Sequence, residues 1–107
     1  MLARQRRLSR ADFAALPPAA SVYRGKTVTV KVFAREGVTK CAVVIPKKEI
    51  KRSVDRHLVK RRIMESLTTI PQGYSIILYI RAGAFLLSFH ELAEEITTLL
   101  RQARVLH

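Results

Sequence analysis

Most side chains that could do chemistry in this sequence are cations, and they concentrate between residues 47 and 62. Eight lysines and arginines there face two acids, Glu49 and Asp55, which leaves a local charge of +6. Clustered guanidinium and ammonium groups neutralise backbone phosphates, and this neutralisation drives binding to nucleic acids. We therefore predict a nucleic-acid-binding segment. Its predicted contact residues are Lys47, Lys48, Lys51, Arg52, Arg56, His57, Lys60, Arg61 and Arg62.

The remaining charge is spread unevenly along the chain. Twenty lysines and arginines against eight aspartates and glutamates give 107 residues a formal net charge of +12. A second basic stretch occupies residues 1–10, whereas residues 82–100 hold three glutamates and no cation. A solvated surface is the alternative interpretation of a single charge run, but it explains two runs and an acidic region less well. The distribution favours a polyanionic partner.

Groups that would let the chain catalyse a reaction by itself are missing. The single cysteine, Cys41, excludes a disulfide framework and zinc sites with several thiolates. His57, His90 and His107 show no metal-ligand spacing, and the four glycines form no phosphate-binding loop. No apolar run approaches the roughly 18 residues of a membrane span. We expect a cytoplasmic domain without catalytic residues, metal ligands or a membrane partner.

Three strands are predicted to form the scaffold that holds the basic segment. Because the sequence is 49% hydrophobic, it can bury one modest core, and we expect residues 1–107 to form a single domain. Alternating apolar residues over 27–34 indicate a strand with one buried face. Residues 40–45 are apolar on both faces, which predicts a central strand. Residues 74–80 predict the third strand.

Three helices are predicted around these strands. Ser9, with Asp12 three residues later, resembles a capping box and predicts a short first helix. A helix over about 51–68 would carry the basic segment, although two apolar stripes compete on its surface. A capping box that begins at Ser88 predicts a last helix over 89–101, after a loop.

The resulting order is α-β-β-α-β-α, with the first helix ending before Pro17-Pro18 and a further strand allowed within residues 19–26. Alternation of helices and strands in this way predicts an α/β (α+β) two-layer sandwich, in which a small mixed sheet has helices packed on it.

The stretch over 47–67, KKEIKRSVDRHLVKRRIMESL, resembles the signature of bacterial ribonuclease P proteins. That family shows an Arg-Asn-Arg-x-Lys-Arg motif after a Ser-Lys-Lys-x-Gly approach, and Arg56, Lys60 and Arg61 match the motif. Four positions depart from the pattern: His57 stands at the asparagine, Leu58 at the second arginine, Lys51 at the glycine and Met64 at a downstream arginine. Arg62 and Lys51 or Arg52 can compensate for the lost charge but not for its geometry, because a guanidinium fork is specific to its position. The departures are compatible with a divergent working subunit or with a relative that binds a different or reduced RNA.

The resemblance extends over most of the chain. Its opening is similar to the family's Arg-Leu…Asp-Phe start, and its last third to a strand ending in Ala-Arg followed by a helix opened by Tyr-x-Glu-Leu. The matching residues are Arg7, Leu8, Asp12 and Phe13 in the first part, and Tyr74, Arg81, Phe89, Glu91 and Leu92 in the second.

The resemblance implies a division of labour in a ribonucleoprotein. Ribonuclease P RNA would cut the 5′ leader from precursor tRNA with magnesium, and the protein, a monomer within the assembly, would bind both RNAs. A cleft would hold the single-stranded leader, with Arg10 and Phe13 on the first helix as one wall and Lys31 on the sheet as the other. The resemblance also implies a left-handed βαβ crossover, against the general right-handed rule.

Alternatives remain for Phe13 and for the whole chain. Phe13 could instead be a hydrophobic staple or a core anchor. A small ribosomal protein would share the basicity and the lack of catalytic residues, but it would have no reason to carry the two matching ends. A DNA-binding module with the 51–68 helix in the major groove is a third reading, yet that helix lacks the Asn and Gln side chains that read bases.

Overall fold

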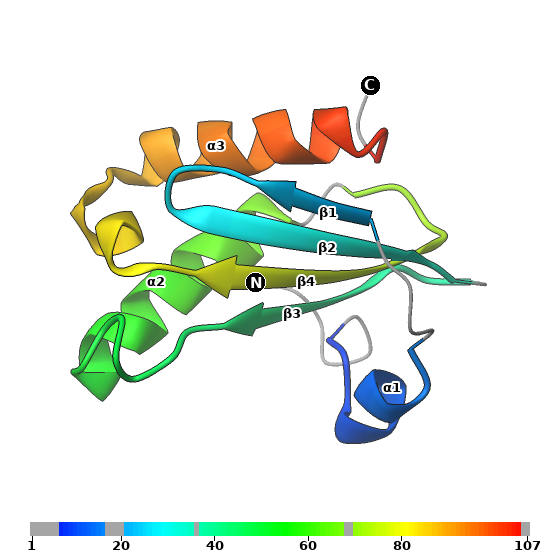
Figure 1. Cartoon of the computed structure of the whole chain (residues 1–107), viewed down its shortest axis with the longest axis horizontal. Helices are drawn as coiled ribbons and strands as arrows, with labels where there is room; N and C mark the ends of the chain where they lie inside the picture. The colour runs from blue at the N-terminus through cyan, green and yellow to red at the C-terminus, as the bar shows by residue number, and fades with distance from the viewer. Residues whose placement is uncertain (1–6, 17–20, 36, 68–69, 106–107) are drawn as a thin grey trace.

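A four-stranded sheet with two long helices on one of its faces forms the body of the protein (Figure 1). The computed structural model describes residues 7–16, 21–35, 37–67 and 70–105. In chain order the elements are α1 (Arg10–Ala14), β1 (Ser21–Arg24), β2 (Val28–Ala34), β3 (Lys40–Val44), α2 (Ser53–Ser66), β4 (Tyr74–Ile80), the 3₁₀ helix η2 (Ala82–Leu86) and α3 (Phe89–Gln102). The predicted fold class and order are confirmed, with the optional strand present as β1, while Pro17-Pro18 lie outside the described residues.

The sheet has the order β1-β2-β4-β3. β1, β2 and β4 pair antiparallel, with Val30 opposite Leu78, whereas β3 runs parallel to β4, with Cys41 opposite Ile76. α2 connects these two parallel strands. In Figure 1 both strands point the same way and α2 lies behind the sheet, so the crossover is left-handed, as the resemblance implied.

The predicted central position of the 40–45 strand is wrong, because β3 is an edge strand. Among the described residues, its outer side is paired near Cys41, where Arg7 forms an isolated parallel bridge and the Leu8 N–H donates to the Cys41 carbonyl over 2.9 Å. Cys41 and Val43 point into the core, and other parts of the chain half-cover the opposite side. Apolar residues on both faces of a strand therefore indicate that other parts of the protein cover both faces. They do not indicate whether the strand lies at the edge or in the centre of the sheet.

Apolar side chains from one face of the sheet and from α2 and α3 form the core. The buried residues are Val28, Val30 and Val32 in β2, Cys41 and Val43 in β3, Ile76, Leu78 and Ile80 in β4, and Leu92, Ile96, Leu99 and Leu100 in α3. On α2 the stripe with Val59 and Ile63 is buried, and the competing residues Val54 and Leu58 are exposed. Cys41 is buried as a small residue of this core.

Both predicted capping boxes are present. The Ser9 hydroxyl accepts from the Asp12 N–H, and the Asp12 carboxylate accepts from the Ser9 N–H over 2.8 Å. Ser88 makes the same exchange with Glu91 at the start of α3. α2 begins at Ser53, two residues later than predicted. Arg52 occupies the N-cap position, and its side chain makes no capping hydrogen bond. The predicted loop after β4 is a 3₁₀ helix, η2.

The turn between β1 and β2 is held between two side chains from the C-terminal half of the chain. Glu95 of α3 accepts from the backbone N–H groups of Thr27 and Val28, over 2.9 and 2.8 Å. Arg81 donates to the Gly25 carbonyl from the other side. A Cβ on Gly25 would lie 2.6 Å from a Glu95 carboxylate oxygen, so glycine is needed for this close approach.

Candidate nucleic-acid interface

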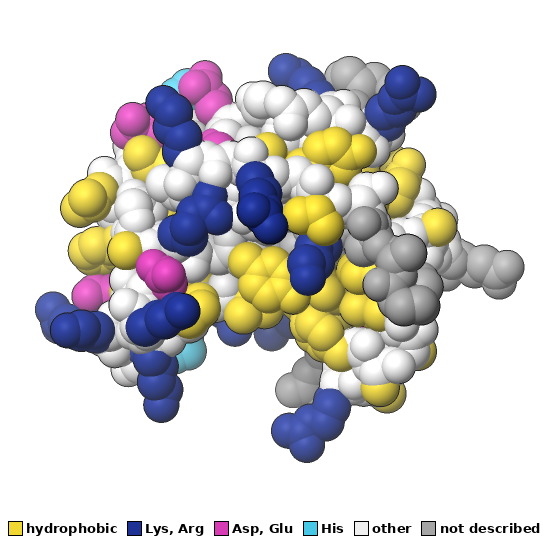
Figure 2. Space-filling model, viewed as in Figure 1, with side chains coloured by type: hydrophobic (Ala, Val, Ile, Leu, Met, Phe, Trp, Pro, Cys, Tyr) yellow, Lys and Arg dark blue, Asp and Glu magenta, His cyan; other side chains and the backbone are white. Residues whose placement is uncertain are grey.

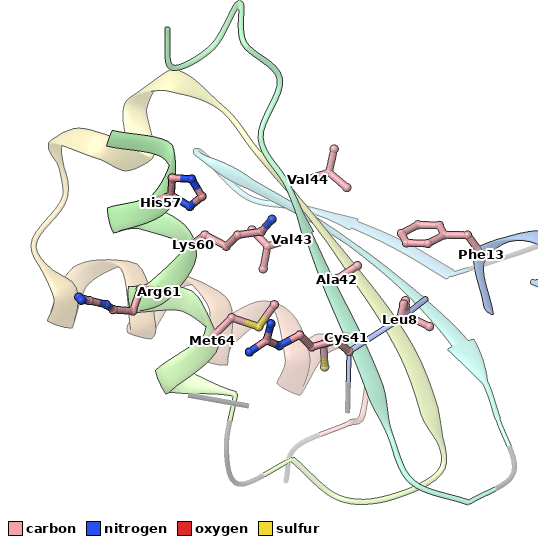
Figure 3. A pocket seen from close by; sticks show the side chains of 11 residues that line it. Leu8, Phe13, Cys41, Ala42, Val43, Val44, His57, Lys60, Arg61 and Met64 are labelled. Atoms are coloured by element: carbon pink, nitrogen blue, oxygen red, sulfur yellow. The ribbon is translucent and has the colours of Figure 1, made fainter. Parts of the chain in front are cut away.

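A cavity of about 430 Å³ opens along the outer edge of β3, between α2 and the N-terminal segment (Figure 3). Three separate stretches of sequence line it. These are Arg7, Leu8 and Phe13 near the N-terminus, Cys41, Ala42, Val43 and Val44 in β3, and His57, Lys60, Arg61 and Met64 in α2. The cavity exists because β3 is an edge strand, which leaves room beside it that a further strand would fill.

The cavity has apolar walls and a basic rim. Figure 3 shows Phe13 beyond β3 on one side, and His57 and Lys60 on the other, where the Lys60 side chain extends toward Val43. The Arg61 side chain points away from β3 in the same view. An apolar space bordered by cations can take a flat ring inside and a phosphate at its mouth.

Phe13 is 38% exposed and lies outside the core cluster, so the core-anchor alternative is wrong. Leu8 and Phe13 line the same cavity, on the two sides of the α1 cap, as the staple alternative required. α1 is attached to the sheet through Asp12, whose carboxylate lies 3.5 Å from the Arg35 guanidinium and 3.3 Å from the Lys40 ammonium. Phe13 therefore borders the cavity on a helix that is fixed in place.

Hydrogen bonds from the Ser9 N–H and hydroxyl, together with the Lys40 ammonium, hold the pKa of the Asp12 carboxyl well below its usual range. Asp12 is consequently ionised at neutral pH and well into the acidic range. The α1 cap and its two ion pairs thus depend on a permanent negative charge in a strongly basic protein.

The basic residues of α2 do not all face the same way. Lys60 lines the cavity, whereas Arg62 is half-buried and lies about 200° further round the helix. Arg56 is also half-buried: one terminal nitrogen of its guanidinium donates to the Ile50 and Lys51 carbonyls, over 2.9 and 2.7 Å. Arg56 therefore fixes the chain before α2, a role that the sequence pattern did not indicate.

The other predicted contact residues lie at or before the start of α2. Lys47, Lys48, Lys51 and Arg52 are exposed. The Arg52 guanidinium lies 3.9 Å from the Asp55 carboxylate, a surface pair that leaves Arg52 largely in solvent. Together with Arg56, His57, Lys60 and Arg61, these residues place eight nitrogen-bearing side chains between the end of β3 and the third turn of α2.

The residues predicted to form the leader cleft do not meet in one cavity. Arg10 is exposed on α1 and does not line the cavity around Phe13. Lys31 lies on the open face of the sheet, with its ammonium 5.1 Å from the centre of the Tyr79 ring. Figure 2 shows hydrophobic side chains gathered near the middle of this face, with Lys and Arg side chains around them. The wall opposite Phe13 is therefore formed by β3 and α2, and β2 contributes a separate surface.

Comparison with known proteins assigns the family. A family model described as Ribonuclease P matches residues 1–104. The chain belongs to the ribonuclease P protein family. A ribonuclease P protein component from Pseudanabaena sp. (strain PCC 6903) is 29% identical over 114 residues, covering 100% of this chain and 98% of the relative.

Solved structures of ribonuclease P proteins share the fold. The Staphylococcus aureus protein is 19% identical with a TM-score of 0.78, covering 92% of this chain and 94% of that one. A mutant of the S. aureus protein described as defective in mRNA degradation reaches a TM-score of 0.84 at 19% identity, with coverage of 96% and 92%. The Thermotoga maritima protein is 20% identical with a TM-score of 0.78, and the coverage is 90% and 96%.

Membership of the ribonuclease P protein family associates the chain with an endoribonuclease complex that processes tRNA. It also implies an RNA partner within a ribonucleoprotein, which agrees with the basic surface around α2. The acidic side chains visible in Figure 2 lie mostly toward the side of the molecule where α3 begins.

Several residues of the interface were missed from the sequence. Tyr79 shares its face of β4 with Ile77, opposite Thr29 of β2, and the two-residue period of the predicted strands could have placed it beside Lys31. Arg7, Leu8 and Met64 line the cavity because distant segments meet there. No local pattern signals such a meeting.

Within the described part of the chain, no group of three or more His, Cys, Asp or Glu side chains could hold a metal ion. None of its helices is both long and apolar enough to cross a membrane.

Proposed function

We propose that this protein binds ribonuclease P RNA through the exposed basic residues around α2, and that the cavity beside β3 receives the single-stranded 5′ leader of precursor tRNA. The observation that carries the proposal is the composition of this cavity. An exposed aromatic ring, Phe13, and an apolar floor lie within reach of the cations Lys60 and Arg7.

The cavity chemistry suits an unpaired strand better than a duplex. A base can stack on an aromatic side chain whatever its identity, and cations beside it can neutralise the phosphates that follow. The edge of β3 supplies apolar contact over the length of Ala42 to Val44. Such contact does not depend on base identity, so it would accept leaders of any sequence.

The division of labour in this proposal leaves the hydrolysis to the RNA. The described residues offer no metal cluster, so the magnesium ions that the reaction needs would be held by the RNA subunit. The protein contributes cations, which replace part of the ionic screening that a folded RNA requires. It also contributes a surface that holds the leader, and with it the substrate, in position.

Two experiments test the proposal. Capture of the protein from its native cell, followed by RNA sequencing, should recover ribonuclease P RNA. Recovery of ribosomal RNA alone would instead identify a ribosomal protein and overturn the proposal.

Reconstitution gives the second test. The protein with ribonuclease P RNA should cleave precursor tRNA at magnesium concentrations at which the RNA alone is slow. The purified protein without RNA should not cleave at all, and magnesium-dependent cleavage by RNA-free protein would contradict the division of labour.

A further inference from the structure

A second, smaller cavity of about 200 Å³ lies beside the first turns of α2. It is lined by Ile45 at the end of β3 and by three nitrogen-bearing side chains of α2: Arg56, His57 and Lys60. His57 and Lys60 also line the larger cavity, so the two spaces adjoin. We call this smaller space the phosphate notch.

The notch contains a guanidinium that is already fixed. Arg56 uses one terminal nitrogen to hold the Ile50 and Lys51 carbonyls, and its other two nitrogens make no hydrogen bond within the described residues. A guanidinium held in this way loses little conformational freedom when an anion binds. Lys60, one helical turn further on, adds a second permanent cation.

His57 is exposed and is surrounded by positive charge from two directions. The charged groups that share its cavities are Arg56, Lys60 and Arg61 from α2 and Arg7 from the N-terminal segment. β3 contributes only the buried thiol of Cys41. No carboxylate of the described residues lines either cavity, so a phosphate bound in the notch would add a negative charge that the lining residues do not supply.

Building on the RNA binding proposed above, we infer that the phosphate notch binds one backbone phosphate of the RNA and that His57 takes up a proton from solvent as this phosphate binds. An anion beside the imidazole favours its protonated form, in which both ring nitrogens donate. The family signature has asparagine at this position, which can donate a hydrogen bond but cannot change its charge. This chain therefore couples RNA binding to pH where the signature residue would not.

The direction of the effect follows from the proton balance. If binding takes up a proton, the RNA affinity rises as the pH falls through the range in which histidine gains its charge. A difference of one pKa unit between the RNA-free and the RNA-bound state corresponds to at most a tenfold change in the RNA dissociation constant. We expect the RNA to bind about fivefold more tightly at pH 6 than at pH 8, at constant ionic strength.

The experiment measures the dissociation constants of ribonuclease P RNA and of a uridine decanucleotide at pH 6, 7 and 8. Uracil does not titrate over the lower part of this range, so the decanucleotide separates protein from RNA effects. His57→Asn should bind with nearly the same affinity at all three pH values. His57→Lys should bind at pH 8 about as tightly as the unmodified protein does at pH 6. His90→Asn is the matched control, because His90 is an exposed histidine on α3 that faces Glu94, and it should keep the pH dependence.

Calorimetry in two buffers of different ionisation enthalpy should show proton uptake on binding, and His57→Asn should abolish it. Equal pH dependence in the unmodified protein and in His57→Asn would overturn the inference while leaving the proposed function intact. Failure to bind either RNA at any pH would instead overturn the proposed function.

Discussion

The two long helices are both 14 residues long and are built in opposite ways. α3 has a capping box at Ser88 and a buried stripe that includes Leu92 and Ile96. α2 begins at Arg52 without a side-chain cap, and much of its surface is cationic. α3 could be recognised from local rules alone because its sequence serves folding. The exposed residues of α2 are those for which we propose RNA binding, and packing against the sheet and its neighbours keeps the helix in place.

The largest effect should come from the core side of α3. Ile96 is 1% exposed, so Ile96→Ala should lower the free energy of unfolding by about 2–5 kcal/mol. Denaturant unfolding measures this loss. The matched change on α2, Val54→Ala at a residue that is 64% exposed, should be nearly neutral. If both variants lost the same stability, the proposed contrast between the helices would be wrong.

The next effect separates the aromatic side chains at the two ends of the molecule. Phe13 borders the cavity opposite α2, and Phe85 lies in η2 before α3; both are 38% exposed. Phe13→Ala should weaken binding of leader-bearing precursor tRNA by roughly 1–3 kcal/mol and leave mature tRNA unaffected. Phe85→Ala should change neither. Equal loss for both tRNA forms would place Phe13 near the RNA but away from the leader, and unfolding curves exclude a stability effect.

Removal of single charges should show whether cations of α2 and α3 differ in their contribution to RNA binding. Lys60→Ala should cost about 1–2 kcal/mol of RNA affinity and reduce the dependence of binding on salt, because one phosphate contact is lost. Arg101→Ala, at an exposed cation in the last turn of α3, should leave both nearly unchanged. Titrations over a range of salt concentrations give the slopes. An unchanged slope for Lys60→Ala would mean that this side chain is only solvated surface.

Because α2 has no side-chain cap, a substitution at Arg52 should raise the stability of the protein and weaken its binding to RNA. Arg52→Ser should stabilise the protein by about 0.5–1 kcal/mol, because serine can accept from the free N–H groups of the first turn. The loss of the surface pair with Asp55 costs little. The same variant should bind RNA less tightly, since it has one cation fewer. A variant with weaker binding and no gain in melting temperature would show that the α2 terminus is already satisfied.

The smallest effect concerns the acid sensitivity of α3. Hydrogen bonds from the Ser88 N–H and hydroxyl lower the pKa of Glu91 below its ordinary value. A carboxylate with a lowered pKa stabilises the folded state above its unfolded pKa, about 4.3, and this contribution disappears as the pH falls through the folded pKa. Glu91→Ala should therefore be less stable than the unmodified protein at pH 7, and the difference should shrink as the pH falls below the unfolded pKa. A difference that stays constant over the acidic range would have to come from another interaction.

The elements could be predicted from sequence wherever their signals are local. The alternation over 27–34 and the two capping boxes reflect interactions between residues two or three positions apart, and both predictions were confirmed. The edge position of β3 could not be predicted, because covered faces produce the same pattern in edge and central strands.

The candidate site was predictable in its charge and not in its shape. Most cations of the basic segment are exposed around α2, as their charge predicts, but the inward turn of Arg56 depends on the carbonyls of Ile50 and Lys51, which the fold brings beneath it. The cavity itself needs residues 7–13, β3 and α2 together. The walls of this cavity were therefore invisible in the sequence, and Lys31, which was predicted for the leader cleft, does not line it.

The edge position of β3 also affects the solubility of the protein when no RNA is bound. Beyond the bridge at Cys41, this edge has no strand partner among the described residues, and such an edge invites pairing with another molecule and aggregation. A second copy approaching it would bring its own basic rim against Arg7 and Lys60. We expect repulsion between these cations to keep the two edges apart, so the same cations would protect the RNA-free protein from aggregation. Screening by concentrated salt weakens this protection, and RNA-free protein stored at high ionic strength should be the form that aggregates first.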